Sequence, residues 1–439
     1  MKDVVGAASA LVVPAKNERE RVDRIARLAL SKTKSASRMF PEVRGVILGG
    51  SFAKGTWLPE DADIDIFVRI DTSTPEPRFE YVGLAVGAKA MSGYSRGKKY
   101  AQHPYTEAVI EGVKVNIVPC YAVSRKRWMS AADRSPFHVR LVRALPEGQK
   151  TQIRLLKKFM KAVGVYGAEI ETQGFSGYVA EVLIMLHGTF LGALQHFADF
   201  KASGHDRLFS LPDPVDTSRD LGIAVSGEKL GRLILASREF LRKPQNAYFG
   251  RMAGMPRPKL KDAVIAVVFT HRRLSEDILW GELRKTMKHI VKHVEARGFA
   301  IARVLAASNN SDSSAFLLIP EFASLPALEQ RVGPTVDMRK ETLSFISSNR
   351  RKAKLVWVDD GARVRLLQER DYTDLTDLLG DVVKGRVGLI GASDEVGDAM
   401  ARSARVLAGK RLSRFAEHRE WVANGINEIV SDAIGTRRA

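Results

Sequence analysis

Cysteine is almost absent from this sequence. Cys120 is the single cysteine among 439 residues, which excludes an intrachain disulfide framework and fits a reducing compartment. Acidic residues are scarce relative to basic ones, because 50 Asp and Glu face 69 Lys and Arg, for a formal net charge of +19. This excess predicts a polyanionic partner, either nucleic acid or anionic lipid, with a basic but uninvolved surface as the alternative.

Long uninterrupted hydrophobic runs are also missing. The stretch 4–15 is apolar but contains Pro14 and no convincing cleavage site, so we interpret it as a helix leading into the fold and not as a signal peptide. A long helix is predicted over 175–200, where two histidines interrupt the apolar run. We interpret it as a buried helix and not as a bilayer span. We therefore expect no membrane association, a cytoplasmic location and nucleic acid as the polyanion.

The first part of the chain, residues 1–140, has the pattern of a small mixed α/β domain. Apolar residues at helical spacing predict a surface helix over 17–31. Strand patterns follow at residues 46–48, 64–68 and 113–118. Pro119 is expected to end the last of these strands, because proline donates no backbone hydrogen bond.

The rest of the chain is predicted to form a helical part, residues 141–252, and an α+β part, residues 253–439. A Pro- and Gly-rich stretch at 250–258 predicts the linker between them. The order strand, helix, strand, strand over 264–319 suggests a ferredoxin-like module, and a helical tail is expected over 399–434. The predicted fold class is therefore multidomain α+β.

A glycine turn directly follows the first predicted strand. Gly50 lets a phosphate approach the backbone, Ser51 offers a hydroxyl and Lys54 offers a cation. A glycine turn after a strand is common, so this pattern alone is a weak indication of phosphate binding.

Two carboxylates open the second predicted strand. Asp63 and Asp65 are two positions apart, so both project from one face while Ile64 and Ile66 point into the core. Carboxylates this close repel unless a cation lies between them. Oxygen ligands beside a phosphate-binding turn indicate Mg²⁺ and two-metal nucleotidyl transfer. The alternative is a solvent-facing acidic edge.

Together these features resemble a known superfamily. A Gly-Ser turn followed by Asp-x-Asp at the start of a strand resembles the nucleotidyltransferases related to DNA polymerase beta. Further segments resemble the archaeal-type (class I) CCA-adding enzymes, which are tRNA nucleotidyltransferases: 51–57 (SFAKGTW), 101–105 (AQHPY), 113–121 (VKVNIVPCY), 130–138 (SAADRSPFH), 154–169 (RLLKKFMKAVGVYGAE), 174–178 (GFSGY) and 213–220 (DPVDTSRD).

The resemblance implies an architecture and an activity. It implies a polymerase-beta-like catalytic head over 1–140, a helical neck over 141–252 that recognises nucleotide and base, and a ferredoxin-like body and tail over 253–439 that bind tRNA. The implied reaction is template-independent addition of C, C and A to the 3′ end of tRNA from CTP and ATP, with Mg²⁺ as cofactor. A homodimer formed through the C-terminal region is also expected.

Individual residues take their expected roles from the same resemblance. Asp63 and Asp65 match the first two metal-binding carboxylates. Arg219 matches the arginine that reads the incoming base together with RNA phosphates, and His103 lies in a motif near the active site. The remaining residues expected around the incoming nucleotide are Gly50, Ser51, Lys54, His138, Lys157 and Tyr166.

Asn116 departs from the family pattern, which has a third catalytic Asp at this position. In the family that Asp binds the metal that activates the RNA 3′ hydroxyl, whereas the amide oxygen of Asn116 coordinates weakly and adds no negative charge. We expect no neighbouring acidic residue to replace this Asp, because Glu107 and Glu111 either point to the wrong face of the strand or lie too far back in the chain. Lys114 shares the face of Asn116 and adds positive charge instead.

Three explanations of Asn116 remain open at this point. The chain is a catalytic knock-out that still binds its substrates, a paralogue with altered activity, or an active enzyme with weakened metal binding. Two competing functions also remain, namely a poly(A)- or uridylyl-type terminal nucleotidyltransferase and a catalytically degenerate tRNA-binding protein.

Overall fold

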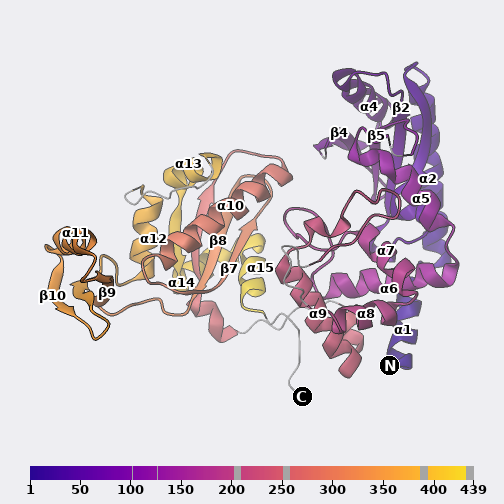
Figure 1. Ribbon diagram of the computed structural model, residues 1–439. Helices are drawn as coiled ribbons and strands as arrows, with labels where there is room; N and C mark the ends of the chain where they lie inside the picture. Colours follow the sequence, from indigo (N-terminus) through magenta and orange to yellow (C-terminus); the bar gives the residue numbers. More distant parts are fainter. Residues whose placement is uncertain (101, 126, 202–208, 251–257, 386–393, 432–439) are drawn as a thin grey trace. The chain divides into compact units, whose positions relative to one another are not determined.

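The computed structural model falls into two compact units, Met1–Ala253 and Gly254–Asp432 (Figure 1). It describes all residues except 101, 126, 202–208, 251–257, 386–393 and 432–439. The linker predicted over 250–258 therefore lies, apart from its two end residues, outside the described residues. The division of the first unit into head and neck at residue 140 remains a prediction.

A five-stranded sheet with helices on one face forms one half of the first unit. The strand order is β1-β2-β5-β4-β3, and only the β2–β5 pair is parallel. The strands are β1 (Val43–Gly49), β2 (Asp63–Ile70), β3 (Ser95–Tyr100), β4 (Pro104–Ile110) and β5 (Val113–Tyr121). Helices α2 (Lys16–Ser37) and α4 (Glu76–Ala90) bury the face that carries Ile64 and Ile66. Strand alternation consequently turns Asp63 and Asp65 to the opposite face.

The prediction that Pro119 ends its strand is wrong. β5 continues to Tyr121, and Pro119 pairs with Val68 of β2. The ladder between β4 and β5 stops at Ile117, and the Tyr121 N–H points away from β2 to the carboxylate of Asp133. Proline is tolerated because its missing N–H faces the side where no strand remains.

Helices form the other half of the first unit. They are α1 (Lys2–Val12), α5 (Ser135–Arg143), α6 (Glu147–Ala162), α7 (Gly177–His187), α8 (Phe190–Ala198) and α9 (Gly227–Arg242). Their core is aromatic: the ring of Phe159 contacts the rings of Phe190, Phe240 and Tyr248 at centroid distances of 5.5–5.6 Å. α1 packs on α6 and joins this second core, not the core under the sheet.

The single helix predicted over 175–200 is two helices, α7 and α8, which bend by 93°. Gly188 leaves the helical conformation with φ of 75°, and the Thr189 hydroxyl then accepts a hydrogen bond from the Gly192 N–H and caps α8. Among the described residues no single helix is long and apolar enough to span a membrane. The two helices of this bent pair reach the required length and apolar composition only when they are taken together.

The second unit is built on a ferredoxin-like sheet, as predicted. Its strands, all antiparallel to their neighbours, lie in the order β12-β6-β8-β7. They are β6 (Ile265–Thr270), β7 (Ile301–Ser308), β8 (Ser313–Pro320) and β12 (Arg405–Ala408). The helices α10 (Glu276–Glu295) and α13 (Asp394–Ser403) complete a β-α-β-β-α-β path and pack on one face. α14 (Gly409–Glu417) and α15 (Glu420–Ile429) pack on the other face.

The expectation of an entirely helical tail over 399–434 is wrong, because β12 interrupts it. This strand has only four residues, too few to show an alternating pattern, and only its pairing with β6 reveals it. An insertion between β8 and α13 adds a three-stranded sheet of order β10-β11-β9. It comprises β9 (Leu328–Thr335), α11 (Arg339–Asn349), β10 (Ala353–Val358), β11 (Arg363–Glu369) and α12 (Leu375–Val383).

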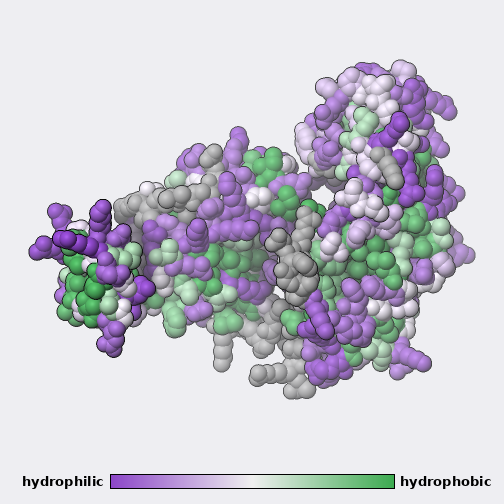
Figure 2. Space-filling model, in the orientation of Figure 1, coloured by the Kyte–Doolittle hydropathy of each residue, from purple (hydrophilic) through white to green (hydrophobic). Residues whose placement is uncertain are grey.

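Hydrophobic side chains lie exposed on this inserted sheet. Figure 2 shows them as green surface around β9–β11. They include Val332, Leu355, Val356 and Val358 of the strands, and Leu343 of the adjoining helix α11 is exposed as well; each is more than 40% exposed. The protein as a whole has the multidomain α+β fold that the sequence predicts.

Candidate active site

Asp63 and Asp65 lie together on the open face of the first sheet. Asp65 is flanked by Gly49 of β1 and by Asn116 of β5. The Asn116 amide Nδ2 donates a hydrogen bond of 2.9 Å to Asp65 Oδ1, while Asn116 Oδ1 is buried without a hydrogen-bond partner in the described part of the chain.

Burial raises the pKa of both carboxyl groups. At Asp65, the Asn116 hydrogen bond and the Lys54 charge oppose this effect. At Asp63, nearby Lys114 opposes it, whereas Asp65, Asp61 and Glu107 raise the pKa further. A divalent cation bound to these two half-buried carboxylates would stabilise their charged forms.

Gly50 brings the backbone against Asp65. It opens the short helix α3 (Gly50–Lys54), which also carries Ser51, immediately after β1. Its φ is 62°, in the left-handed region, and a Cβ at this position would lie 1.8 Å from Asp65 Oδ2. Only glycine allows this approach, so the structure brings together the predicted turn and the predicted carboxylates.

These residues fit a divalent metal ion. Asp63 and Asp65 supply anionic oxygens on one face, and the orphaned Asn116 Oδ1 supplies a neutral one beside them. Hard divalent cations prefer oxygen donors of this kind.

Lys54 and Lys157 meet at one buried carboxylate, Glu181 of α7. Lys54 Nζ lies 2.7 Å from Glu181 Oε2, and Lys157 Nζ lies 2.9 Å from Glu181 Oε1. The Thr56 hydroxyl donates a third hydrogen bond to Glu181 at 2.6 Å. Burial alone would raise the pKa of Glu181, but Lys157 and Lys54 outweigh it and lower this pKa to about 2.

Sequence reasoning missed Glu181. The available signal was a single acidic residue at the start of an otherwise uncharged helical run, since a buried charge requires a partner. One carboxylate between two ammonium groups leaves one net positive charge behind the Gly50–Ser51 turn.

Tyr166 belongs to the same group of side chains. A Cβ built on Gly177 would lie 2.7 Å from the Tyr166 hydroxyl and 3.5 Å from Lys157 Nζ, so the two polar atoms flank this glycine. Burial raises the pKa of Tyr166 strongly, which keeps the phenol protonated.

His138 and Arg219 converge on a second buried carboxylate, Asp213. His138 Nε2 lies 2.9 Å and Arg219 Nη1 lies 3.5 Å from Asp213 Oδ2. The Tyr178 hydroxyl donates to Asp213 Oδ1 at 3.1 Å, and its ring stacks on the His138 ring at a centroid distance of 3.8 Å. Lys54 Nζ lies 4.8 Å from the centroid of the Tyr178 ring, which links this group to the lysine pair.

Burial of His138 lowers its pKa and opposes a positive charge on the ring. Asp213 is held as a carboxylate, because its hydrogen bonds from His138 and from the Val215 N–H outweigh burial and lower its pKa to about 2. Sequence reasoning named His138 and Arg219 but neither Asp213 nor Tyr178. Both missed residues lay inside the quoted motifs DPVDTSRD and GFSGY.

His103 is not brought to the carboxylate pair. Its Nδ1 lies 3.2 Å from Glu80 and 3.6 Å from Glu76, and its ring contacts Phe79. All three partners belong to α4, which covers the sheet face opposite Asp63 and Asp65. Its ligand atoms form a possible cation group with those of Glu76 and Glu80, but exposed acidic groups of this kind are common without an ion.

The sequence analysis expected Glu107 to lie too far from Asn116, or on the wrong face of its strand, to replace the third carboxylate. This expectation is wrong, because Glu107 lies directly opposite Asn116 in the β4–β5 pair. Residues opposite one another in a ladder project to the same face. Glu107 therefore shares the face of Asn116, as Lys114 also does. Glu111, in contrast, forms a salt bridge with Arg24 of α2, with 2.6 Å between Glu111 Oε2 and Arg24 Nη2.

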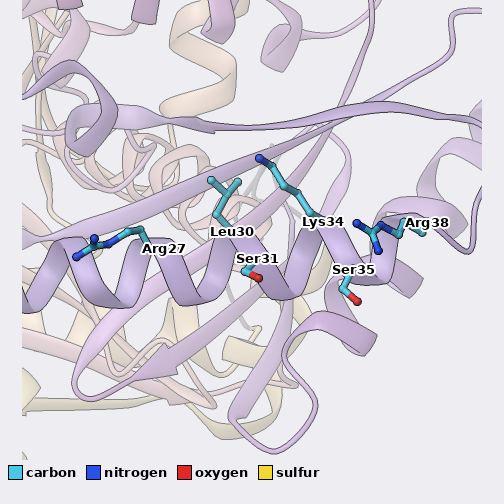
Figure 3. Close-up of a pocket in the computed structure, with 6 residues that line it drawn as sticks. All are labelled: Arg27, Leu30, Ser31, Lys34, Ser35 and Arg38. Carbon is cyan, nitrogen blue, oxygen red and sulfur yellow. The ribbon is translucent and has the colours of Figure 1, made fainter.

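A separate groove of about 500 Å³ lies along α2 (Figure 3). It is lined by Arg27, Leu30, Ser31, Lys34, Ser35 and Arg38. Since α2 covers the sheet face opposite the carboxylates, this groove contains none of the predicted site residues.

Three family models match consecutive parts of the chain. The nucleotidyltransferase domain matches residues 32–138, the second domain of tRNA nucleotidyltransferase matches residues 151–250, and the C-terminal domain of the CCA-adding enzyme matches residues 261–409. The chain is thus a nucleotidyltransferase.

Relatives that match most of the chain show which family of nucleotidyltransferases it belongs to. The CCA-adding enzyme of Halorubrum lacusprofundi is 32% identical over 92% of this chain and 96% of the relative. That of Pyrobaculum islandicum is 31% identical over 86% and 93%. The chain belongs to the archaeal-type CCA-adding enzymes, a family of tRNA nucleotidyltransferases.

Two solved structures resemble a little more than half of the chain. Cid1, described as having RNA terminal uridylyl transferase activity, is 12% identical with a TM-score of 0.44 and covers 57% of this chain and 98% of its own. CdnC of E. coli MS115-1 with ATP is 18% identical with a TM-score of 0.42 and covers 56% and 94%.

Proposed function

We propose that this protein adds C, C and A to the 3′ end of tRNA, using CTP and ATP without a nucleic-acid template. The observation that carries the proposal is the Asp63–Asp65 pair held against the Gly50–Ser51 turn, in a chain whose relatives are CCA-adding enzymes over nearly their full length. The net charge of +19 supports a polyanionic substrate.

The chemistry is an in-line displacement at phosphorus. The 3′ hydroxyl oxygen of the RNA bonds to the α-phosphorus, the bond to pyrophosphate breaks, and the hydroxyl proton is lost to solvent. Asp63 and Asp65 would hold Mg²⁺, with Asn116 Oδ1 as a weaker neutral donor. When bound, Mg²⁺ neutralises charge that develops on the phosphate oxygens and lowers the pKa of the hydroxyl.

The triphosphate would lie over the turn and the lysine pair. The Gly50–Ser51 turn offers backbone and hydroxyl donors, and the pair formed by Lys54 and Lys157 keeps one net positive charge beside Glu181. Tyr166 stays protonated and can donate its hydroxyl hydrogen to a phosphate oxygen.

The base would be read at the Asp213 group. Arg219 is 43% exposed at its side chain, so its guanidinium is oriented by Asp213 but still offers N–H donors outward. The stacked His138 and Tyr178 rings hold the other side of Asp213 and limit its movement.

The test is primer extension on tRNA that lacks its CCA end, with CTP and ATP supplied separately and together. Two CMP and one AMP additions, followed by a stop, support the proposal. Continued addition, or indifference to CTP, would indicate a poly(A)- or uridylyl-type enzyme. Asp63→Asn serves as the inactive control.

Asn116 favours a second candidate, a catalytically degenerate tRNA-binding protein. That candidate predicts salt-sensitive tRNA binding with no incorporation even at high Mn²⁺. The first candidate predicts incorporation by the natural chain.

We further propose a homodimer formed through the C-terminal region, supported by the exposed apolar side chains of β9–β11. Sedimentation equilibrium of the full chain and of Val356→Lys tests it, because a charge on this face should shift the mass to that of a monomer. The cytoplasm is the proposed location, as expected for processing of tRNA.

A further inference from the structure

We propose that Glu107 supplies the carboxylate that Asn116 lacks, as a ligand of the divalent ion on the RNA side of the site. This inference rests on the proposed nucleotidyl transfer. The family's third carboxylate lies on the strand β5, and in this chain the negative charge is moved to the adjacent strand β4.

Strand register places Glu107 in the site. Asp65 of β2 pairs with Asn116 of β5, and Asn116 pairs with Glu107 of β4. The three side chains therefore form one row on the open face of the sheet. Cβ atoms of directly opposed residues are about 4.5–5.5 Å apart, and glutamate is one methylene longer than aspartate, so the Glu107 carboxylate can reach over Asn116 toward Asp65.

The neighbours of Glu107 leave it available. On its other side the row ends at Gly97 of β3, which has no side chain to cover it. The backbone of Glu107 belongs to the ladders with β3 and β5. Within the described residues, the Glu107 carboxylate has no hydrogen-bond or ion-pair partner, and the residue is partly buried.

Asn116 complements this arrangement. Its Nδ2 is committed to Asp65, and its Oδ1 is a buried acceptor without a partner in the described structure. A cation between Asp65 and Glu107 would satisfy that oxygen. An aspartate at 116 would instead place a further negative charge directly between the two carboxylates. Glu107 and Asn116 thus keep the number of anionic ligands at three.

Metal binding gives a test that does not depend on catalysis. Mn²⁺ is titrated, with free ion followed by electron paramagnetic resonance, into the full-length protein carrying a non-hydrolysable CTP analogue. We expect Glu107→Gln to raise the dissociation constant of one ion by about tenfold or more, because affinity follows the charge of the ligands. Glu111→Gln removes a nearby carboxylate outside the site and should leave the constant unchanged. Equal Mn²⁺ binding by Glu107→Gln and the natural chain would overturn the proposal.

A rescue experiment separates a ligand from a merely structural residue. CMP incorporation should fall by about a hundredfold or more in Glu107→Gln, since a charged ligand of the transition state is lost. Asn116→Asp added to Glu107→Gln should restore most of the rate and the Mn²⁺ affinity. Failure of this second change to restore either quantity contradicts the proposal. If the natural chain incorporates nothing, CCA addition itself fails, and the Mn²⁺ titration still decides the role of Glu107.

Discussion

Glu181 is the residue that joins the two halves of the first unit electrostatically. It lies on α7, yet its partners Lys54 and Thr56 belong to the turn region after β1, and Lys157 belongs to α6. This one buried carboxylate is shared by two buried ammonium groups, so it offsets part of the cost of burying them and leaves one positive charge. The same residue therefore supports the fold and sets the charge behind the proposed triphosphate site.

Replacing this carboxylate should be costly for stability. Glu181→Gln leaves two buried lysines without a counter-ion, so we expect the free energy of unfolding to drop by about 3–5 kcal/mol, as measured by urea denaturation. Glu20→Gln is the matched control, because Glu20 is 68% exposed in its pair with Lys16 and should change stability by less than about 1 kcal/mol. Equal effects of the two substitutions would contradict this account.

The stabilising effect of Glu181 should also depend on pH. Its folded-state pKa is lowered to about 2 from an ordinary value of 4.5, so its contribution is fully present above pH 4.5 and is lost as pH falls toward 2. The difference in unfolding free energy between the natural chain and Glu181→Gln should therefore be constant from pH 5 to 7 and smaller at pH 3. A difference that grows on acidification would refute the assignment.

The break between α7 and α8 is the element on which the helical core depends. α7 carries Glu181 and Tyr178 toward the site, while α8 places Phe190 beside Phe159. A continuous helix over the same residues could not reach both. Gly188 makes the bend possible because it adopts a positive φ.

Gly188→Ala tests this element. A Cβ at Gly188 would contact nothing within 4 Å, so only backbone strain opposes it, and we expect a loss of about 1–2 kcal/mol in unfolding free energy. Gly231→Ala is the control, for which we expect the unfolding free energy to change in the opposite direction. Gly231 lies inside α9 with equally open space, and alanine should stabilise that helix by about 0.5–1 kcal/mol. Thermal unfolding of both variants measures the contrast, and stabilisation by both would show that the bend is not strained.

At the scale of the whole molecule the net charge of +19 is the dominant feature. Phosphate contacts release counterions, so tRNA affinity should fall by at least about tenfold between 50 and 200 mM KCl. Filter binding at several salt concentrations measures the slope. Binding of free CTP, which neutralises fewer phosphates, is the control and should be less sensitive. A tRNA affinity independent of salt would argue against a polyanion surface.

Local patterns in the sequence were enough for much of the site. Alternation predicted that Asp63 and Asp65 share one face, and the glycine turn before them was correctly placed against that face. The helix α2 and the strands β1, β2 and β5 followed from periodicity, because a long apolar stripe or alternation is itself the cause of burial. The ferredoxin-like module followed from element order alone.

Cross-strand neighbours could not be predicted in the same way. Parity within one strand is visible in a sequence, but the register between β4 and β5 depends on their turn and on packing. For this reason the sequence placed Glu107 out of reach, whereas the ladder sets it opposite Asn116. The short strand β12 and the bend at Gly188 were missed for a related reason, since each depends on distant partners.

The amino-acid sequence by itself determined the composition of the site: paired carboxylates after a glycine turn, two lysines, an arginine and an asparagine in place of a third acid. Tertiary structure alone decided which charges neutralise one another, pairing Glu181 with both lysines and Asp213 with His138 and Arg219. The physical reason is that side-chain chemistry is carried by each residue, whereas electrostatic interaction depends on distance and burial. These distances and this burial are set only when segments far apart in the chain pack together.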